Sequence, residues 1–494
     1  MSRKLIIIGA GFAGLSAAAF MAKAGWDVTV VEKNDTAGGR ARQLNAAGFR
    51  FHMGPSWYWM PDVFERFFHQ FGKKVEDYYH LKRLDPSYRI YWKEEAMDVP
   101  ANYGEIRNMF EGIEKGSSRM LDNYLKEAHT KYRIGMQDLV YKPGRSIMEF
   151  LDWEVVRNFL RLDVFTPIKS HIARHFRDPR LRQLMEFPIL FLGALPENTP
   201  ALYSLMNYAD LIGGTWYPDG GMFSVVKAMQ DLAEELGARF QFNESAEQII
   251  IEKGRAKKLV TSRGIYGADA IISGADYYFT ESALLPASYR NYSEQYWNKK
   301  TLAPSCLMYY VGIDQKLPQL HHHSLFFDVP FDAHAAEIYQ HPQWPADPLF
   351  YVSAASRTDS SVAPSGCENL VFLIPVASGL EHDTEALREK YFQKILKRFE
   401  KHTGASIGDS IVFKKSFSVS DFVQDYHSFK GNAYGLANVL SQTAILRPSC
   451  KSKKVSNLFF TGQFTVPGPG VPPSLISGEV VSEQLIQSFN GNRI

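Results

Sequence analysis

Three glycines near the start of the chain stand at a spacing that can bind a diphosphate group. Gly9, Gly11 and Gly14 follow a short apolar run, and the acidic residue Glu32 lies 23 residues after Gly9. The first glycine permits a tight turn, the second lets the backbone approach a pyrophosphate, and the third lets a helix pack closely on a strand. Glu32 is placed to accept hydrogen bonds from a ribose hydroxyl pair, and its charge disfavours the 2′-phosphate of NADP.

The elements that must position these residues can be read on either side of the glycines. "KLIIIG" (4–9) is typical of a buried parallel strand, and "DVTVVE" (27–32) predicts a second one. Between them the Ala-rich "LSAAAFMAKAG" (15–25) predicts a helix that ends at Gly25. A secretory signal would share the basic start and the apolar stretch. The strand, glycines, helix, strand and acid in register favour a dinucleotide-binding unit instead.

The composition narrows the class of protein. The chain has 494 residues, 45% apolar and 22% charged, as in folded globular proteins, and its length allows two to four domains. The net charge of +2 does not favour a nucleic acid as partner. The cysteines Cys306, Cys367 and Cys450 form neither a metal-binding nor a disulfide pattern, which fits a reducing compartment. No apolar run reaches the roughly 18 residues that cross a bilayer.

The middle of the chain changes character. Residues 117–138 and 152–182 are predicted to be amphipathic helices, and 153–182 carries seven Arg or Lys against three acids. Such a segment is typical of a membrane-surface patch, with a buried helical lid as the alternative. Residues 285–455 alternate β-like runs with a helix at 382–402, which predicts a second sheet domain facing the first. We interpret "QLHHHS" (319–324) as an exposed loop, because consecutive histidines cannot all face one metal ion.

Two segments after Glu32 resemble the flavin-containing amine oxidase and phytoene desaturase superfamily. Gly38-Gly39-Arg40 is similar to the segment in which glycines let the chain cross the flavin diphosphate and the arginine adds charge. "GFRFHMGPSW" (48–57) is similar to the segment in which the backbone approaches the flavin, but His52 stands where the family usually has Asp. The resemblance leaves two roles for His52: it braces the structure, or it accepts a proton.

The resemblance extends over nearly the whole chain, to the bacterial-type carotenoid (phytoene) desaturases. The range 216–276 is similar to the family's helix and β-meander, where the residue at Ala246 gives backbone contacts to adenine. The C-terminal "TGQFTVPGPGVPPSLISG" (461–478) is similar to a turn of the carotenoid branch. It departs from the usual form at Pro473, where many members have Gly, and at Pro469, which splits two glycines.

The resemblance implies an α/β fold. Its parts would be a Rossmann-like FAD-binding domain (1–85, 216–285 and 456–494), an interleaved substrate domain of mixed β-sheet and helices (286–455), and a helical membrane-associating region (86–215). The implied cofactor is FAD, and no metal is expected. The residues expected to bind FAD are Gly9, Gly11, Phe12, Ala13, Gly14, Glu32, Lys33, Gly38, Gly39, Arg40, Gly54, Pro55, Ser56, Ala246, Gly462, Gln463, Gly470, Val471 and Pro472.

The C-terminal turn would be the second half of the flavin site. "NLFFTGQF" (457–464) predicts the last buried strand, and the glycines after it would leave room for the isoalloxazine. Pro473 is expected to be the first residue of a helix whose N-terminus points at the pyrimidine end of the flavin.

The implied activity is desaturation of a long polyene. A hydride passes from an allylic C–H to flavin N5, and a neighbouring carbon then loses a proton. The protein would supply positioning and an apolar tunnel, and no catalytic side chain is identified. Water, the flavin nitrogens and an acid in the tunnel are the candidate proton acceptors. The run Trp57–Met60 either lines the tunnel or fills the core. Two candidate substrates remain: phytoene, and a later carotenoid such as a 1-hydroxylated one desaturated at C3–C4.

The resemblance also implies partners. A hydrophobic carotenoid must come from a membrane, so we expect a cytoplasmic protein peripherally associated with the cell membrane. Oxygen or a quinone would reoxidise the flavin. Two alternatives stay open: another flavin oxidase, acting on amines or protoporphyrinogen, and a non-enzymatic prenyl-binding chaperone on the same fold.

Overall fold

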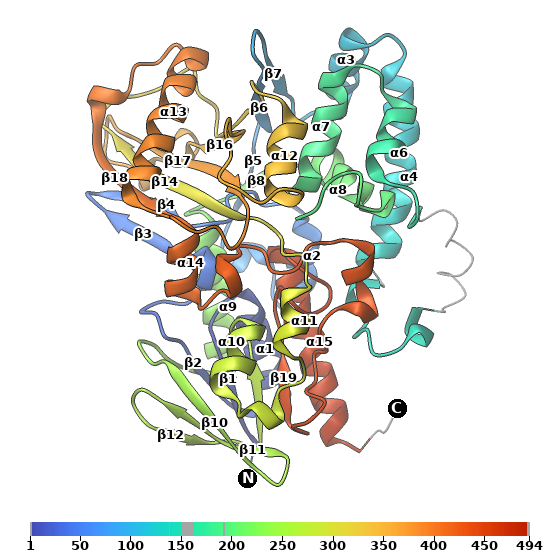
Figure 1. Cartoon of the computed structure of the whole chain (residues 1–494), viewed down its shortest axis with the longest axis vertical. Helices are drawn as coiled ribbons and strands as arrows, with labels where there is room; N and C mark the ends of the chain where they lie inside the picture. The colour runs from blue at the N-terminus through green and yellow to red at the C-terminus, as the bar shows by residue number, and fades with distance from the viewer. Residues whose placement is uncertain (1, 138, 151–162, 191–192, 492–494) are drawn as a thin grey trace.

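The computed structural model describes residues 2–137, 139–150, 163–190 and 193–491. Two main sheets lie one beyond the other along the long axis of the molecule, with the N-terminus at the end that carries the parallel sheet (Figure 1). The strands are β1 (Lys4–Ile8), β2 (Asp27–Val31), β3 (Gln43–Ala46), β4 (Phe49–His52), β5 (Leu81–Arg83), β6 (Tyr88–Tyr91), β7 (Ala96–Val99), β8 (Trp216–Pro218), β9 (Arg239–Gln241), β10 (Ala246–Glu252), β11 (Arg255–Thr261), β12 (Ile265–Gly267), β13 (Ala270–Ser273), β14 (Ser305–Ile313), β15 (His323–Phe326), β16 (Phe350–Ser353), β17 (Glu368–Val376), β18 (Ile411–Phe417) and β19 (Leu458–Phe460). The helices are α1 (Phe12–Lys23), α2 (Pro61–His69), α3 (Tyr103–Ile113), α4 (Ser117–Gln137), α6 (Ile168–His175), α7 (Pro179–Leu190), α8 (Leu205–Tyr208), α9 (Met222–Glu235), α10 (Tyr277–Phe279), α11 (Glu294–Asn298), α12 (Phe331–Tyr339), α13 (Glu385–Thr403), α14 (Val419–Tyr426) and α15 (Val471–Phe489).

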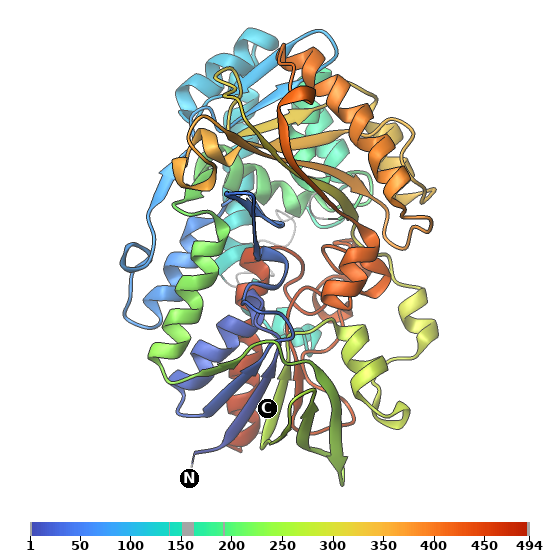
Figure 2. The ribbon, with the colours of Figure 1, turned by 90° about the vertical axis from the view of Figure 1, so that its left-hand side faces the viewer.

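The parallel sheet draws its strands from both ends of the chain, in the order β19-β13-β1-β2-β9. Alternate side chains of β1 enter different cores. Leu5 and Ile7 pack with the helices, whereas Ile6 and Ile8 pack with Ile249 and other residues of the β10–β12 sheet. Both faces are therefore covered, which is why β1 is apolar without alternation. Figure 2 shows the β10–β12 sheet and the helical layer on opposite sides of these strands.

The helical layer depends on a close approach of two helices from opposite ends of the sequence. Helix α1 packs against both α9 and α15. A Cβ atom on Gly478 of α15 would lie 2.5 Å from the Ala13 carbonyl oxygen of α1 and 2.6 Å from Ser16 Cβ. Glycine and the small residues of α1 thus let the backbones come together, and α15 is held against the start of α1.

The larger sheet has seven strands in the order β18-β14-β17-β16-β15-β6-β7, antiparallel except for the β15–β6 pair. Helix α13 packs its apolar side, including Phe392 and Phe399, on one face. The β3–β4 hairpin packs Phe49 and Phe51 on the other face. The predicted helix at 382–402 is found at Glu385–Thr403, where Thr384 caps it by accepting a hydrogen bond from Leu387 N.

The helices α3, α4, α6 and α7 gather beside the larger sheet (Figure 1). Part of the predicted helix at 152–182 lies outside the described residues, and α6 and α7 occupy its later part. Within the described residues, none of the helices combines the length and the apolarity needed to cross a bilayer.

Two expectations from the sequence are wrong. The histidine run is not an exposed loop, because His322 and His323 are buried and His323 begins β15. The last helix begins at Val471 and not at Pro473, because Gly470 takes a positive φ of 114° and the two prolines fall inside the first turn, where no backbone N–H is needed.

Candidate functional site

A cavity of about 910 Å³ lies at the carboxyl ends of the parallel strands. Ile8, Val31, Gly274 and Thr461, at or just beyond the ends of four of these strands, line it. Ligands of open parallel sheets bind at this edge, where helix N-termini and loops meet.

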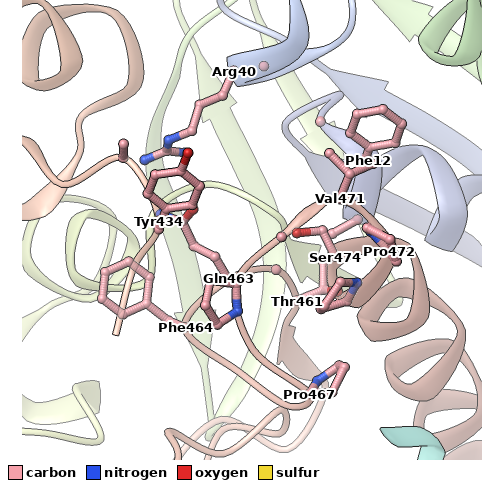
Figure 3. A pocket seen from close by; sticks show the side chains of 18 of the residues that line it. Phe12, Arg40, Tyr434, Thr461, Gln463, Phe464, Pro467, Val471, Pro472 and Ser474 are labelled. Atoms are coloured by element: carbon pink, nitrogen blue, oxygen red, sulfur yellow. The ribbon is translucent and has the colours of Figure 1, made fainter. Parts of the chain in front are cut away.

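The cavity brings the predicted cofactor residues together. Every one of them lines it except Gly14: Gly9, Gly11, Phe12, Ala13, Glu32, Lys33, Gly38, Gly39, Arg40, Gly54, Pro55, Ser56, Ala246, Gly462, Gln463, Gly470, Val471 and Pro472. Figure 3 shows Arg40 and Gln463 on one side of this space and Phe12 and Val471 on the other.

The three N-terminal glycines have different local roles. Gly9 takes a positive φ of 93°, which favours glycine in the turn. A Cβ atom on Gly14 would lie 2.0 Å from the Gly9 carbonyl oxygen, so Gly14 lets α1 begin against the end of β1. A Cβ atom on Gly11 would meet no protein atom within 4 Å. Gly11 therefore leaves open space in the cavity, whereas Gly14 allows close packing of α1 on the end of β1.

Two helices present N-termini without a side-chain cap to the cavity. The caps are Gly11 for α1 and Gly470 for α15, and neither helix has an acidic residue in its first turn. Free N–H groups and the positive end of the helix dipole attract anions. The α1 end is thus suited to a diphosphate.

Glu32 is buried at the end of β2. Its two carboxylate oxygens accept hydrogen bonds from Ala10 N at 2.8 Å and Asn34 N at 2.9 Å. These bonds tie the glycine turn to the second strand and fix the direction of the carboxylate. Oε1 also accepts from Asn34 Nδ2 at 2.8 Å, whereas Oε2 keeps a further lone pair, with which it can accept from a hydroxyl group of a ribose.

Arg40 places a buried cation in the wall of the cavity. Its guanidinium donates to Ser428 Oγ at 3.0 Å and Asn432 O at 3.3 Å and lies over the Tyr426 ring. Burial lowers the pKa of Arg40, while the charge of Asp276 opposes that change. Its Nε has no hydrogen-bond partner among the described residues. A buried guanidinium bonded only to neutral oxygens suits an anionic ligand.

His52 does not support the Gly38–Arg40 turn through its side chain. Its Nε2 lies 3.4 Å from the Tyr217 hydroxyl, and the ring fills the space where Gly221 has no Cβ atom. The turn is held instead by backbone, since Met53 N donates to Arg42 O at 3.0 Å and Gly54 lies against Arg40 O. His52 therefore braces the start of α9, and it does not line the cavity.

The C-terminal turn is tied to its own helix. Ser477 Oγ of α15 accepts a hydrogen bond from Gly462 N at 3.0 Å and lies 3.0 Å from Thr461 Oγ1 and 2.9 Å from Thr465 Oγ1. These contacts hold the turn at the end of β19, against the cavity.

The half of the cavity away from Glu32 is mainly apolar. Trp57, Trp59 and Met60 line it, whereas Tyr58 is buried in the core, so the aromatic run divides between the two expected roles. Other apolar or aromatic lining residues are Met136, Leu139, Val140, Leu202, Tyr203, Leu205, Met206, Met308, Tyr351, Leu373, Tyr434 and Val466. A second chamber of about 50 Å³ shares Cys306, Tyr351, Leu373 and Tyr434 with this half.

Sequence reasoning missed several lining residues. Asp276 accepts a hydrogen bond from Phe429 N at 3.1 Å, and burial raises its pKa to about 6. The position of Asp276 just after β13 could have identified it in the sequence, because residues at strand ends line such sites. Tyr351, Tyr434 and Asn438 come from the larger sheet and the loops beside it, and no local pattern marks them.

One cavity thus joins a polar half suited to a dinucleotide and an apolar half suited to a hydrophobic group, an arrangement typical of oxidoreductases that use a nucleotide cofactor. The family model described as flavin containing amine oxidoreductase matches residues 12–486, so the chain belongs to that family. Within it, relatives place the chain among the carotenoid desaturases.

Three such relatives cover nearly the whole chain. A carotenoid 3,4-desaturase from Haloarcula japonica is 42% identical and covers 98% of each chain. A zeta-carotene-forming phytoene desaturase from Myxococcus xanthus is 31% identical, with 98% of this chain and 94% of its own covered. A 4,4′-diapophytoene desaturase (4,4′-diaponeurosporene-forming) from Staphylococcus aureus is 30% identical, with 98% and 99% covered. The protein is therefore a flavin-dependent oxidoreductase of this group.

Solved structures share the fold at low identity. An oxidoreductase from Methanosarcina mazei has a TM-score of 0.63 at 18% identity, covering 97% of this chain and 100% of its own. A putrescine oxidase bound to putrescine has a TM-score of 0.62 at 15% identity, covering 98% and 99%. These likenesses agree, at the level of the fold, with the family that the matching model shows.

Proposed function

We propose that the enzyme is an FAD-dependent desaturase that acts on a carotenoid near one end, at the C3–C4 bond. The observation that carries the proposal is a single cavity with a polar half suited to a dinucleotide and an apolar half suited to a polyene. The 3,4-desaturase of Haloarcula japonica, at 42% identity, supports this reaction over that of the phytoene desaturase at 31%.

The residues present fit FAD. The uncapped N-terminus of α1 and the Arg40 guanidinium would hold the diphosphate, and Glu32 would hold a ribose. Ala246, a small residue that lines the same cavity as Glu32, leaves room for an adenine. The N-terminus of α15 would receive the polar edge of the isoalloxazine. When bound, the flavin supplies the oxidising power, by accepting a hydride from an allylic C–H.

The chain itself contributes position and exclusion of water. Trp57, Trp59 and Met60 present apolar surface to the substrate, which burial beside the cofactor orients. A dry wall also protects the substrate cation left by hydride loss, because water would add to it.

The small chamber favours a bond near the end of the carotenoid. At about 50 Å³ it can take only a short end group beyond Tyr351 and Tyr434. The C3–C4 bond has only the C1–C2 end and its methyl groups beyond it, whereas a central bond has a long chain on both sides.

Two incubations test this assignment. Purified protein with bound flavin is given phytoene or a 1-hydroxycarotenoid in liposomes, and conjugated double bonds are counted. We expect new conjugation from the hydroxylated substrate only. Ala335 lines the chamber, and Ala335→Leu should abolish that reaction, whereas Ala333→Leu on the exposed side of α12 should not.

Each of the two alternative functions predicts a different result in these experiments. An amine or protoporphyrinogen oxidase would turn over its own substrate and leave both carotenoids unchanged. A prenyl-binding chaperone would neither bind flavin nor reduce it. Visible spectra and product analysis of the same preparation separate the three possibilities.

We further propose that the protein takes its substrate from the cytoplasmic surface of a membrane. Four large apolar side chains that line the cavity are also exposed and thus form an apolar rim at its mouth: Phe165, Leu440, Ile445 and Leu446. Lys142, also in the cavity wall, adds a positive charge suited to anionic lipid. Several charges of the 152–182 segment are instead paired within the protein, as in Arg180 with Asp178 and Glu95.

The electron acceptor is proposed to be oxygen or a membrane quinone. The bound flavin is first reduced once, and its reoxidation rate is then measured after addition of oxygen or, under anaerobic conditions, of a quinone. An acceptor that leaves the flavin reduced over a turnover time is excluded.

A further inference from the structure

Two buried histidines connect the cavity with the outside of the larger sheet. His323 is 0% exposed and His322 is 5% exposed, and neither belongs to a group of possible metal ligands in the described part of the chain. The Nε2 atoms of both rings lack a hydrogen-bond partner among the described residues. Because buried polar groups in proteins are nearly always paired, this arrangement requires an explanation.

On the cavity side, a tyrosine links His323 to the lining. The Tyr351 hydroxyl lies 2.9 Å from Ser56 Oγ and 2.5 Å from His323 Nδ1. Ser56 and Tyr351 both line the cavity. Trp57 stacks on the His323 ring with centroids 4.2 Å apart and planes 7° apart, which fixes the ring's orientation.

On the outer side, the path continues through the second ring. The ring centroids of His323 and His322 are 4.4 Å apart, and His322 Nδ1 lies 2.7 Å from Thr358 Oγ1. Thr358 is partly exposed. Two hydrogen-bonded pairs, Tyr351 with His323 and His322 with Thr358, thus lie in series between the apolar half of the cavity and the surface, and the two histidine rings are in contact without a hydrogen bond between them.

The chemistry of desaturation requires a proton acceptor in this half. Hydride loss leaves a cation, and the neighbouring C–H must then give up its proton. Among the described residues, the carboxylates and the imidazole that line the cavity all come from the segments around the dinucleotide end: Glu32, Glu244, Asp276, Asp425 and His427. Burial lowers the pKa of His322 to about 3 and that of His323 well below its ordinary value, so both rings are unprotonated before the reaction and hold a received proton only weakly.

We propose that Tyr351 is the catalytic proton acceptor and that His323 and His322 carry the proton away. This assignment rests on the proposed desaturase function. The C–H bond next to the cation breaks, and its electron pair becomes the new C=C bond. The proton goes to the Tyr351 oxygen as the hydroxyl proton of Tyr351 moves to His323 Nδ1. The His322 ring then turns so that its Nε2 accepts the proton of His323 Nε2–H, and His322 Nδ1–H passes a proton to Thr358 and solvent.

The test uses the flavin-loaded enzyme with carotenoid deuterated at either reacting carbon. In Tyr351→Phe we expect kcat to fall about 100-fold, the range of a lost general base, with KM and flavin content unchanged. In the parent enzyme we expect kcat to be slowed by deuterium at the hydride-donating carbon. In the variant the larger isotope effect on kcat should come from deuterium at the proton-losing carbon. His323→Gln should show the same shift to a smaller extent, and water-trapped, hydroxylated by-product should appear in both.

Tyr309→Phe is the matched control, because Tyr309 is equally buried in the same sheet and its hydroxyl donates to Arg388 O at 2.6 Å, away from the cavity. It should keep the parental isotope effects. If Tyr351→Phe does not fold, the same measurements are made on Ser56→Ala and His323→Gln instead. Parental rates and isotope effects in these variants would overturn the relay, whereas a parent enzyme that holds flavin but leaves carotenoids unchanged would overturn the proposed function itself.

Discussion

At the scale of single residues, the glycines around the cavity have two separate purposes. Gly14 removes a clash between helix and strand, because a Cβ there would lie 2.0 Å from Gly9 O. Gly11, with an ordinary φ of −76°, has no neighbour within 4 Å on the side of its absent Cβ. One glycine is thus required by the protein, and the other by the ligand that we propose.

The same substitution at these two positions should have different effects. Gly14→Ala should lower the free energy of unfolding by about 1–3 kcal/mol, as expected for overpacking, and reduce flavin content with it. Gly11→Ala should leave the free energy of unfolding unchanged and reduce only flavin content. Urea unfolding of the flavin-free proteins and visible absorbance of the purified ones measure both quantities, and equal unfolding curves for the two variants would contradict the distinction.

Buried Asp210 should make stability fall with rising pH. Burial raises its pKa to about 7, although Tyr88 OH donates to Oδ2 at 2.7 Å. The folded state therefore holds this proton more tightly than the unfolded state. Its contribution is complete below the unfolded pKa and is lost as the pH rises through about 7.

Asp210→Asn removes this titration. From about pH 5 to about pH 8, the free energy of unfolding of the variant should rise by about 2–3 kcal/mol relative to that of wild type. Urea unfolding at both pH values measures the gain, and Asp35→Asn, at an exposed position, controls for the loss of a surface charge. A constant difference between Asp210→Asn and wild type would rule out the explanation.

The residues of the dinucleotide half could be predicted because local physics marks them. A glycine at a turn, an acid after a strand and a glycine pair before Arg40 each leave a pattern in adjacent positions. Tyr351 and His323 could not be found this way, since their meeting depends on how β15 and β16 pair. The histidine run was misread because burial on the larger sheet is not encoded within those three residues.

At the scale of elements, α15 connects the cofactor site to the helical layer. Ser477 holds the turn before it, and Gly478, the next residue, fits against α1. The two contacts sit on one turn of helix, so a change in packing moves the wall of the cavity.

Gly478→Ala should therefore affect both stability and flavin binding. Its Cβ would lie 2.5 Å from Ala13 O, so α15 must move away from α1, and we expect a loss of about 1–3 kcal/mol together with lower flavin content. Gly112→Ala in α3 is the control, because a Cβ there meets nothing within 4 Å and alanine favours helix. Thermal unfolding with and without added flavin distinguishes the two variants, and full flavin content in Gly478→Ala would refute the connection.

Regular elements were predictable to the extent that their period is local. The strand at 4–8 and the helix at 385–403 follow from apolar runs and spacing. The sequence places the start of α15 two residues too late, because a proline in the first turn can occupy either the first or the third helical position. The conformation of Gly470 determines where the helix begins.

At the scale of the whole molecule, the cavity is formed where the parallel sheet meets the larger sheet and the helices beside it. Its apolar mouth brings Phe165 together with Leu440 and Leu446, which lie about 275 residues later in the sequence. The sequence alone does not show that gathering, although Phe165 belongs to the segment 152–182 that it indicates as a membrane contact.

Membrane binding should depend on this rim. The double variant Phe165→Asp/Leu446→Asp should lose most of its flotation with vesicles that contain anionic lipid, because two exposed apolar contacts are replaced by repelled charges. Ile265→Asp/Val412→Asp alters two exposed side chains elsewhere and should float like wild type. Equal flotation of both variants would place the contact outside the rim.

The order of strands in the parallel sheet has a consequence for biosynthesis. β19 pairs with β13, and α15 packs on α1, so the edge of the sheet at β13 and one side of α1 lack these partners until residues 458–489 have been made. Until then that side of α1 and the unfinished cavity are exposed. Flavin capture must therefore follow synthesis of the C-terminal turn and α15, and folding in the cell depends on protection of this intermediate from aggregation.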